Sequence, residues 1–423
     1  MLLVSAAASR PVRPPLWLAV ATVVAGWAAI YDIGVWVVLF VQHPIHADFR
    51  IFYVAAEAGL RYGWSSIYDV SVLRSLSVSF PAGQNFIDFS LPFIHPPLVA
   101  WLVAPLTALP LPAAYALWSA VLLAGLVLAW YIAAPYSGLR KVATLLLALA
   151  LWPVLDALYF GQPSTLQLAL LAGAWWLCTN DRPLAAGAAL AFATALKPHT
   201  VILVPAALAV SGRYRSFLSW AVVCTLIATA FVLALGPSGL NNWWQALVYG
   251  QTDPGQSLYT TAYLFGSGPL TYAVEALQGA IALVVARRRR ADLNVVFAVS
   301  LVGSLAFAFH LHKYDYIELI LAVWLILRTA PPLWHRLWLL AGVGTLQALD
   351  LGQPIPQLVW DLGWLVILAV DTSAAHSGSL PVRGEGDLRS SQSHQSRADP
   401  GVKRVLDRIL GAVRLAAPTT RGG

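Results

Sequence analysis

The residues best suited to do chemistry begin just beyond the first long apolar run of the chain. Asp48 lies about seven residues past that run, and Arg50 follows two positions later. A carboxylate at a membrane surface can act as a general base and take a proton from a hydroxyl group. Asp is also favoured at the N-cap of a helix, and a helix-like stretch follows it, so helix capping is the alternative interpretation.

A second candidate is a cation at the edge of an apolar run. Lys197 ends such a run and is followed by Pro198 and His199. A charge at the bilayer centre costs about 2.5–3.5 kcal/mol on insertion scales, so an intramembrane ionisable residue is a functional candidate by default. An ammonium group at this position suits a phosphate, whereas a lysine that snorkels to the interface is the alternative.

The densest titratable cluster of the chain contains His310, His312, Lys313 and Asp315. Histidine titrates near neutrality and lysine is a compact positive charge, so phosphate contact or proton transfer would suit this cluster. A satisfied interfacial cluster is the alternative. Two histidines two positions apart are weak evidence for a metal site, and we expect none.

The composition indicates a polytopic membrane protein. Of 423 residues, 59% are hydrophobic and only 11% are charged, whereas soluble domains average about 25% charged residues. The net charge of +7 lies mostly in short loops and a tail, which favours membrane topology over nucleic acid as its explanation. Cys178 and Cys224 both lie in apolar runs, which argues against a disulfide framework.

The positive-inside rule gives the orientation. A spanning helix needs about 20 apolar residues, and residues 16–41 form the first such run, preceded by Arg10 and Arg13. Residues 1–15 are therefore predicted to be cytoplasmic, and Asp48 to face outward.

We expect an all-α membrane domain over residues 16–371, with about twelve spanning helices and external loops at 43–93 and 236–267. After it, residues 372–423 have the composition of a disordered cytoplasmic tail, in which 402–415 could form a basic amphipathic helix. Besides the first, the spans are expected near residues 113–134, 141–159, 163–178, 184–197, 198–211, 216–235, 268–286, 292–309, 316–328, 334–350 and 356–371.

The segment 95–109 is predicted to be a re-entrant or surface-lying helix. If it crossed the bilayer, the later basic loops would face outward, including the four adjacent arginines at 287–290. With this topology the unusual polar and aromatic residues gather on one face, where they are candidates for substrate contacts. The candidates for substrate contacts are Tyr53, Glu57, Asp69, His95, Gln162, His199, Trp243, Trp244 and Asp315.

Several short motifs, taken together and in order, resemble a known family. They are Asp48-Phe-Arg-Ile-Phe-Tyr-Val-Ala-Ala-Glu with Ile67-Tyr68-Asp69, His95-Pro96-Pro97-Leu98 through Ala104-Pro105-Leu106, Gly161-Gln162-Pro163 and Lys197-Pro198. Over residues 16–330 the chain resembles glycosyltransferase family 87 of the GT-C superfamily, the polyprenyl-phosphate-mannose-dependent mannosyltransferases of bacterial envelope glycolipid synthesis. His95 and Pro163 stand where family members often have Tyr and Asn.

The resemblance implies a GT-C-type fold in the bacterial cell membrane, a polyprenyl-phosphate sugar donor, a glycolipid or glycan acceptor and an outward-facing site with Asp48 as base. The transfer is expected to invert the anomeric centre. Cations must then stabilise the departing phosphate, and the candidates for this role are Lys197, His310, His312, Lys313 and Arg50. A donor with a single phosphate carries less charge than a nucleotide-sugar diphosphate, so neither a metal nor another cofactor is expected.

Three alternatives stay open at this point. The same fold could use another lipid-phosphate sugar, for example an arabinofuranosyl donor. A secondary transporter or flippase would place its substrate near the bilayer midplane at a repeat interface, but no convincing repeat is present. A polymerase or ligase of lipid-linked glycans would be expected to have more arginine and histidine in a late external loop.

Overall fold

A computed structural model describes residues 14–42, 47–77, 93–251 and 257–374, and these residues are helical apart from their connecting segments. The predicted tail helix at 402–415 and parts of the N-terminus and first loop lie outside the described residues. The α-helices are α1 (Leu16–Gln42), α2 (Ala47–Tyr62), α3 (Val70–Ser77), α4 (Pro97–Val103), α5 (Leu111–Ala133), α6 (Gly138–Leu149), α7 (Trp152–Phe160), α8 (Ser164–Thr179), α9 (Pro183–Leu196), α10 (Leu203–Val210), α11 (Tyr214–Gln251), α12 (Ala262–Phe265), α13 (Pro269–Arg288), α14 (Leu293–Phe307), α15 (Glu318–Arg328), α16 (Leu333–Ala348) and α17 (Pro354–Ala374).

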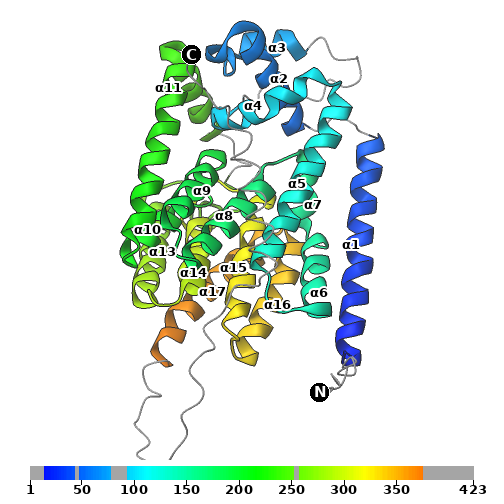
Figure 1. Ribbon diagram of the computed structural model, residues 1–423, viewed down its shortest axis with the longest axis vertical. Helices are drawn as coiled ribbons and strands as arrows, with labels where there is room; N and C mark the ends of the chain where they lie inside the picture. The colour runs from blue at the N-terminus through cyan, green and yellow to red at the C-terminus, as the bar shows by residue number, and fades with distance from the viewer. Residues whose placement is uncertain (1–13, 43–46, 78–92, 252–256, 375–423) are drawn as a thin grey trace, which may run out of the picture.

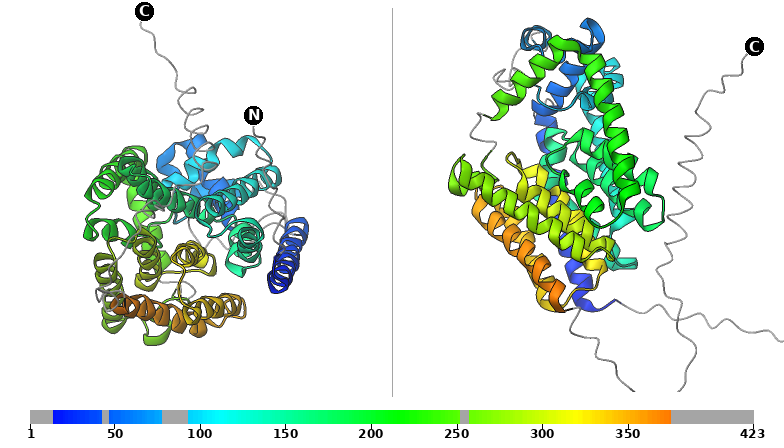
Figure 2. Two further views of the ribbon diagram at one scale, coloured as in Figure 1. Left: turned by 60° about the horizontal axis from the view of Figure 1, so that its bottom comes forward. Right: turned by 90° about the vertical axis from the view of Figure 1, so that its left-hand side faces the viewer.

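The helices form a bundle with a cap of short helices at one end. Figure 1 shows α2, α3 and α4 together at one end of the bundle, beyond the end of α1, while α11 runs along most of the long axis. The two further views in Figure 2 show α13 and α17 side by side on another flank of the bundle. Segments that join the cap to the bundle are therefore the ones that can enclose a site.

The membrane character is supported, but the predicted count of about twelve spans is not confirmed. Among the described residues, four helices are long and apolar enough to cross a bilayer: α1, α5, α11 and α13. A fifth span results if α6 and α7, which meet at a bend of 58°, are counted as one. The remaining helices that coincide with predicted spans are mostly shorter. Even the 16 residues of α8 extend only about 24 Å at 1.5 Å per residue, less than the ~30 Å hydrocarbon core.

Two other expectations meet different local structures. The predicted second external loop begins inside α11, which continues to Gln251 through a kink at Gly236 and Pro237. Gly236 has a φ of 59°, which glycine adopts without strain, and Pro237 removes a backbone donor, so the helix bends here. The segment predicted to be re-entrant forms α4 and a 3-10 turn, Ala104–Ala108. That this segment is re-entrant or lies on the membrane surface stays a prediction.

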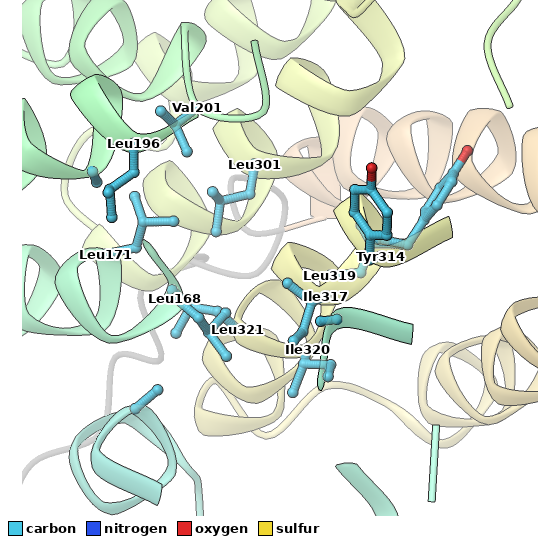
Figure 3. Close-up of a cluster of buried hydrophobic side chains, with 14 of the residues drawn as sticks. Leu168, Leu171, Leu196, Val201, Leu301, Tyr314, Ile317, Leu319, Ile320 and Leu321 are labelled. Carbon is cyan, nitrogen blue, oxygen red and sulfur yellow. The ribbon is translucent and has the colours of Figure 1, made fainter. Parts of the chain in front are cut away.

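The core lies where α8, α14 and α15 meet. Nearly every residue of α14 is buried, and the aliphatic side chains of α8 and α15 pack beside it. Figure 3 shows part of this cluster, with Leu168 of α8 beside Leu321 of α15. By contrast, α1 exposes a broad apolar surface that includes Trp17, Val20 and Trp27, as expected of a helix that faces lipid.

Close packing of α9 on α11 depends on Gly187. A Cβ atom added there would lie 2.4 Å from the Ser216 carbonyl oxygen of α11, whereas one added at Gly173 of α8 would meet nothing within 4 Å. Small residues allow helix backbones to approach closely in membrane proteins. Gly187 therefore sets the distance between these two helices.

We expect Gly187→Ala to lower the free energy of unfolding by about 1–3 kcal/mol, because the added methyl group forces the two backbones apart. The matched variant Gly173→Ala should be neutral or stabilising by up to about 1 kcal/mol, because alanine is the better helix former. Thermal unfolding of both variants in detergent tests this. Equal stability of the two variants would contradict the packing role.

Candidate active site

The turn between α7 and α8 brings Gln162 to Asp48. Gly161 ends α7 in the left-handed conformation, with φ at 71°, and the Gln162 N–H donates to the Ala157 carbonyl oxygen at 2.8 Å. This six-residue closure is a common helix C-terminus. A Cβ atom at Gly161 would lie 2.7 Å from the Cβ of Phe49, so glycine also permits the close approach of α7 to α2.

Asp48 lies in the first turn of α2 and takes part in a short polar chain. Its Oδ2 accepts a hydrogen bond of 2.5 Å from Gln162 Nε2, and Gln162 Oε1 lies 3.2 Å from His95 Nε2. The amide nitrogen of Gln162 is thus the donor to Asp48, which leaves its carbonyl oxygen to accept from His95 Nε2–H. These hydrogen bonds orient the carboxylate of Asp48 and set the tautomer of the His95 imidazole.

Burial sets the charge states of Asp48 and His95. It raises the pKa of Asp48 to about 6, although the Gln162 hydrogen bond and the charge of Lys197 act in the opposite direction. Burial, with Lys197 nearby, also lowers the pKa of His95 to about 3. At neutral pH Asp48 is therefore a carboxylate with the basicity suited to proton abstraction, and His95 is a neutral donor.

Lys197 lies at the C-terminal end of α9 and is buried with a carboxylate partner. Its Nζ forms an ion pair with Asp315 Oδ1 and donates to Ser164 Oγ at 3.1 Å. The Gln167 side chain positions the backbone of this turn, donating to the Lys197 carbonyl oxygen at 2.7 Å. Lys197 follows an apolar run in the sequence, but in the fold its ammonium group lies among polar partners. We call Lys197, Asp315 and Ser164 the polar junction.

Asp315 is the counter-ion of this junction. Its Oδ2 accepts from the His312 N–H at 2.7 Å and lies 3.6 Å from His199 Nε2. Burial acts to raise the pKa of Asp315, but Lys197 and His199 together hold it well below the usual range. Asp315 therefore stays ionised, and it neutralises Lys197 in the absence of another anion.

Two cavities adjoin these groups. The base cavity, about 370 Å³, is lined by Asp48, Asp156, Gln162, Lys313 and neighbouring aromatic residues. The lysine cavity, about 300 Å³, is lined by Lys197, His199, His310, Asp315 and apolar residues such as Leu247. They share the residues Ile94, His95, Gly250, His312 and Tyr314, so the cavity at Asp48 and the cavity at Lys197 are adjacent.

The dense cluster at 310–315 is divided between the two cavities. His310 lines the lysine cavity, where burial lowers its pKa to about 2, so its ring is neutral. Lys313 instead lines the base cavity, with its Nζ 3.5 Å from both Asp156 Oδ2 and Asp350 Oδ1. His312 lines both. The two lysines therefore occupy separate ion clusters.

Several residues proposed from the sequence line neither cavity and have other partners. Arg50 is buried and donates through Nη2 to the Ser77 carbonyl oxygen at 3.2 Å. The Tyr53 hydroxyl donates to the Leu109 carbonyl oxygen at 2.9 Å. Glu57 forms an i,i+4 ion pair with Arg61. None of the three lines either cavity.

Three further candidates differ in their positions. The Asp69 carboxylate accepts from the Ser71 and Val72 N–H groups at the start of α3, outside both cavities. Trp243 lines the lysine cavity and stacks on Tyr68 with ring centroids 5.6 Å apart. Trp244 is 66% exposed and lines neither cavity.

Sequence reasoning missed Asp156, Ser164 and Tyr314. Asp156 is buried in α7 and lines the base cavity, and a carboxylate inside an apolar run was the signal that could have found it. Ser164 and Tyr314 carry no comparable signal, because a hydroxyl group is unremarkable in a membrane helix or at its end. Among the described residues, no group of three His, Cys, Asp or Glu side chains could hold a metal ion.

Comparison with known proteins gives one match. The sequence model of glycosyltransferase family 87 matches residues 93–311, about half of the chain. No curated protein and no solved structure matches the chain. The matched region includes His95, Gln162, Lys197 and His310, and it ends before Asp315; Asp48 precedes it.

We expect Lys197→Met and Asp315→Asn each to lower the free energy of unfolding by about 3–5 kcal/mol, because each leaves a buried charge without its partner. The double variant should lose less than the sum of the two, since neither charge remains. Thermal unfolding of the four proteins gives the coupling energy. Additive losses would mean that the ion pair does not hold the two segments together.

Proposed function

The chain belongs to glycosyltransferase family 87, and we propose that it transfers a mannosyl residue from a polyprenyl-phosphate donor to a glycolipid or glycan acceptor at the extracytoplasmic face of a bacterial cell membrane. The long apolar helices support a multi-pass membrane protein. Asp48 is the general base, and the transfer inverts the anomeric centre.

The observation that carries this proposal is that the base cavity and the lysine cavity are adjacent and share five lining residues. An inverting displacement needs a base on one side of the anomeric carbon and stabilisation of the leaving group on the other. Asp48 lines one cavity and Lys197 the other, and their shared lining residues lie between them. A sugar placed between the cavities would have its two reacting ends next to the two required groups.

The bond changes follow from this placement. Asp48 takes the proton of an acceptor hydroxyl as its oxygen attacks the anomeric carbon. The bond from that carbon to the phosphate oxygen breaks, and its electron pair remains on the phosphate. Lys197 stabilises this charge by exchanging part of its contact with Asp315 for the phosphate. His310, whose ring is neutral, and His199 line the same cavity and are available to donate hydrogen bonds to the phosphate.

The apolar parts of the two cavities suit the rest of the substrates. Leu196, Leu247 and Phe309 line the lysine cavity and would contact the polyprenyl chain next to its phosphate. Phe160 and Tyr249, with Asp156 and Lys313, line the base cavity. Aromatic faces beside charged hydrogen-bonding groups are suited to a sugar acceptor. We therefore assign the donor to the lysine cavity and the acceptor to the base cavity.

The first test is transfer of radiolabelled mannose from polyprenyl-phosphate mannose to membrane lipids, with EDTA present. Asp48→Asn should lower the rate at least about 10²-fold, because general base catalysis supplies about 10²–10⁴-fold. The control is Asp181→Asn, an exposed loop residue with φ at 53°, which removes a carboxylate elsewhere. Full activity of Asp48→Asn would exclude this base. An inactive wild-type protein would point to another sugar donor or to transport.

A second test is the pH dependence of the transfer. Because burial raises the pKa of Asp48 to about 6, kcat/KM should fall about tenfold per pH unit below pH 6 and level off above pH 7. The Gln162 hydrogen bond lowers that pKa, so Gln162→Leu should move the fall to higher pH. A rate that stays constant from pH 7 down to pH 5 would contradict the assignment.

A further inference from the structure

Tyr314 lies where the base cavity and the lysine cavity meet. It belongs to the 3-10 turn Lys313–Ile317 and lines both cavities. Only five residues are shared in this way among those described, and Ile94 and Gly250 offer no side-chain donor. The side-chain donors common to both cavity linings are therefore His95, His312 and Tyr314.

The hydroxyl group of Tyr314 is the uncommitted donor of the three. His95 is already bonded to Gln162, and His312 has contacts of its own. Tyr314 is 8% exposed, yet no described residue forms a hydrogen bond with its hydroxyl group. Buried tyrosine hydroxyls usually find a partner, as that of Tyr316 does at 2.9 Å on the Tyr259 carbonyl oxygen.

The surroundings of the ring hold it in place and keep the phenol protonated. The Lys197 ammonium lies 4.3 Å from the ring centroid, and the rings of Phe160 and His312 pack against it at 6.0 and 5.0 Å. Burial, with the charges of Asp48 and Asp315 nearby, raises the pKa of Tyr314 well above its usual value. The hydroxyl group is thus a hydrogen-bond donor at every physiological pH.

We propose that the Tyr314 hydroxyl group donates a hydrogen bond to the phosphate oxygen that leaves the sugar during transfer. This deepens the proposed function and rests on it. Tyr314 keeps its proton throughout: the acceptor proton goes to Asp48, and the electron pair of the breaking carbon–oxygen bond goes to the phosphate. As negative charge grows on that oxygen the hydrogen bond strengthens, so Tyr314 stabilises the transition state more than the bound donor.

The experiment compares Tyr314→Phe with wild type in two assays. In steady-state transfer, kcat should fall about 10–100-fold while the KM for polyprenyl-phosphate mannose changes less than about threefold. In the second assay, binding of polyprenyl monophosphate is followed by quenching of tryptophan fluorescence, and the variant should bind about 3–10-fold more weakly. Tyr272→Phe, an exposed residue of α13, is the matched control and should behave as wild type.

The outcomes separate this proposal from the proposed function. Wild-type kcat and wild-type lipid-phosphate binding in Tyr314→Phe would overturn the role of Tyr314 while leaving Asp48 in place. A change confined to the KM of the acceptor would overturn it too, by placing the hydroxyl group on the acceptor. Wild type that binds the lipid phosphate but transfers no mannose would overturn the sugar assignment alone, and the binding assay would still test Tyr314. Thermal unfolding of the variant excludes loss through misfolding.

Discussion

The ion pair between Lys197 and Asp315 is the interaction on which the site depends. An unpaired charge in such a buried place would cost several kcal/mol, so the end of α9 and the turn before α15 must lie together. The second oxygen of Asp315 binds the His312 N–H, which fixes the segment that carries His310 and Tyr314. One pair of charges therefore positions much of the lining of the lysine cavity, including Tyr314, which also lines the base cavity.

Two carboxylates share this space in opposite environments. Desolvation dominates at Asp48, whose hydrogen-bond donor among the described residues is a neutral amide, and its pKa is raised to about 6. At Asp315 burial again acts to raise the pKa, but Lys197 and the neighbouring histidines together hold it well below the usual range. Carboxylates whose environments separate their pKa values in this way are suited to different roles. Asp48 has the character of a base, and Asp315 that of a permanent counter-ion.

Two charged candidates from the predicted first external loop make short-range contacts. Glu57 pairs with a residue one helical turn away, and Asp69 accepts from backbone N–H groups two and three positions on. Such short-range contacts compete with function at every charged residue, and a residue type does not reveal which contact wins. Lys197 and His310 line the lysine cavity, because their long-range partners come from segments distant in the chain.

The sequence alone determined that the chain is helical and apolar, where most helices lie, and which helix ends carry ionisable residues. Periodicity and hydropathy are local properties, so they can be read without the fold. It did not determine the number of spans, since the short helices α8, α9 and α14 are sheltered by protein and follow no length rule. Only the tertiary structure decided that Gln162 orients Asp48, that Lys313 pairs with Asp156, and that Tyr314 lies between two cavities. These contacts join residues far apart in the chain, and they exist only once packing brings the helix ends together.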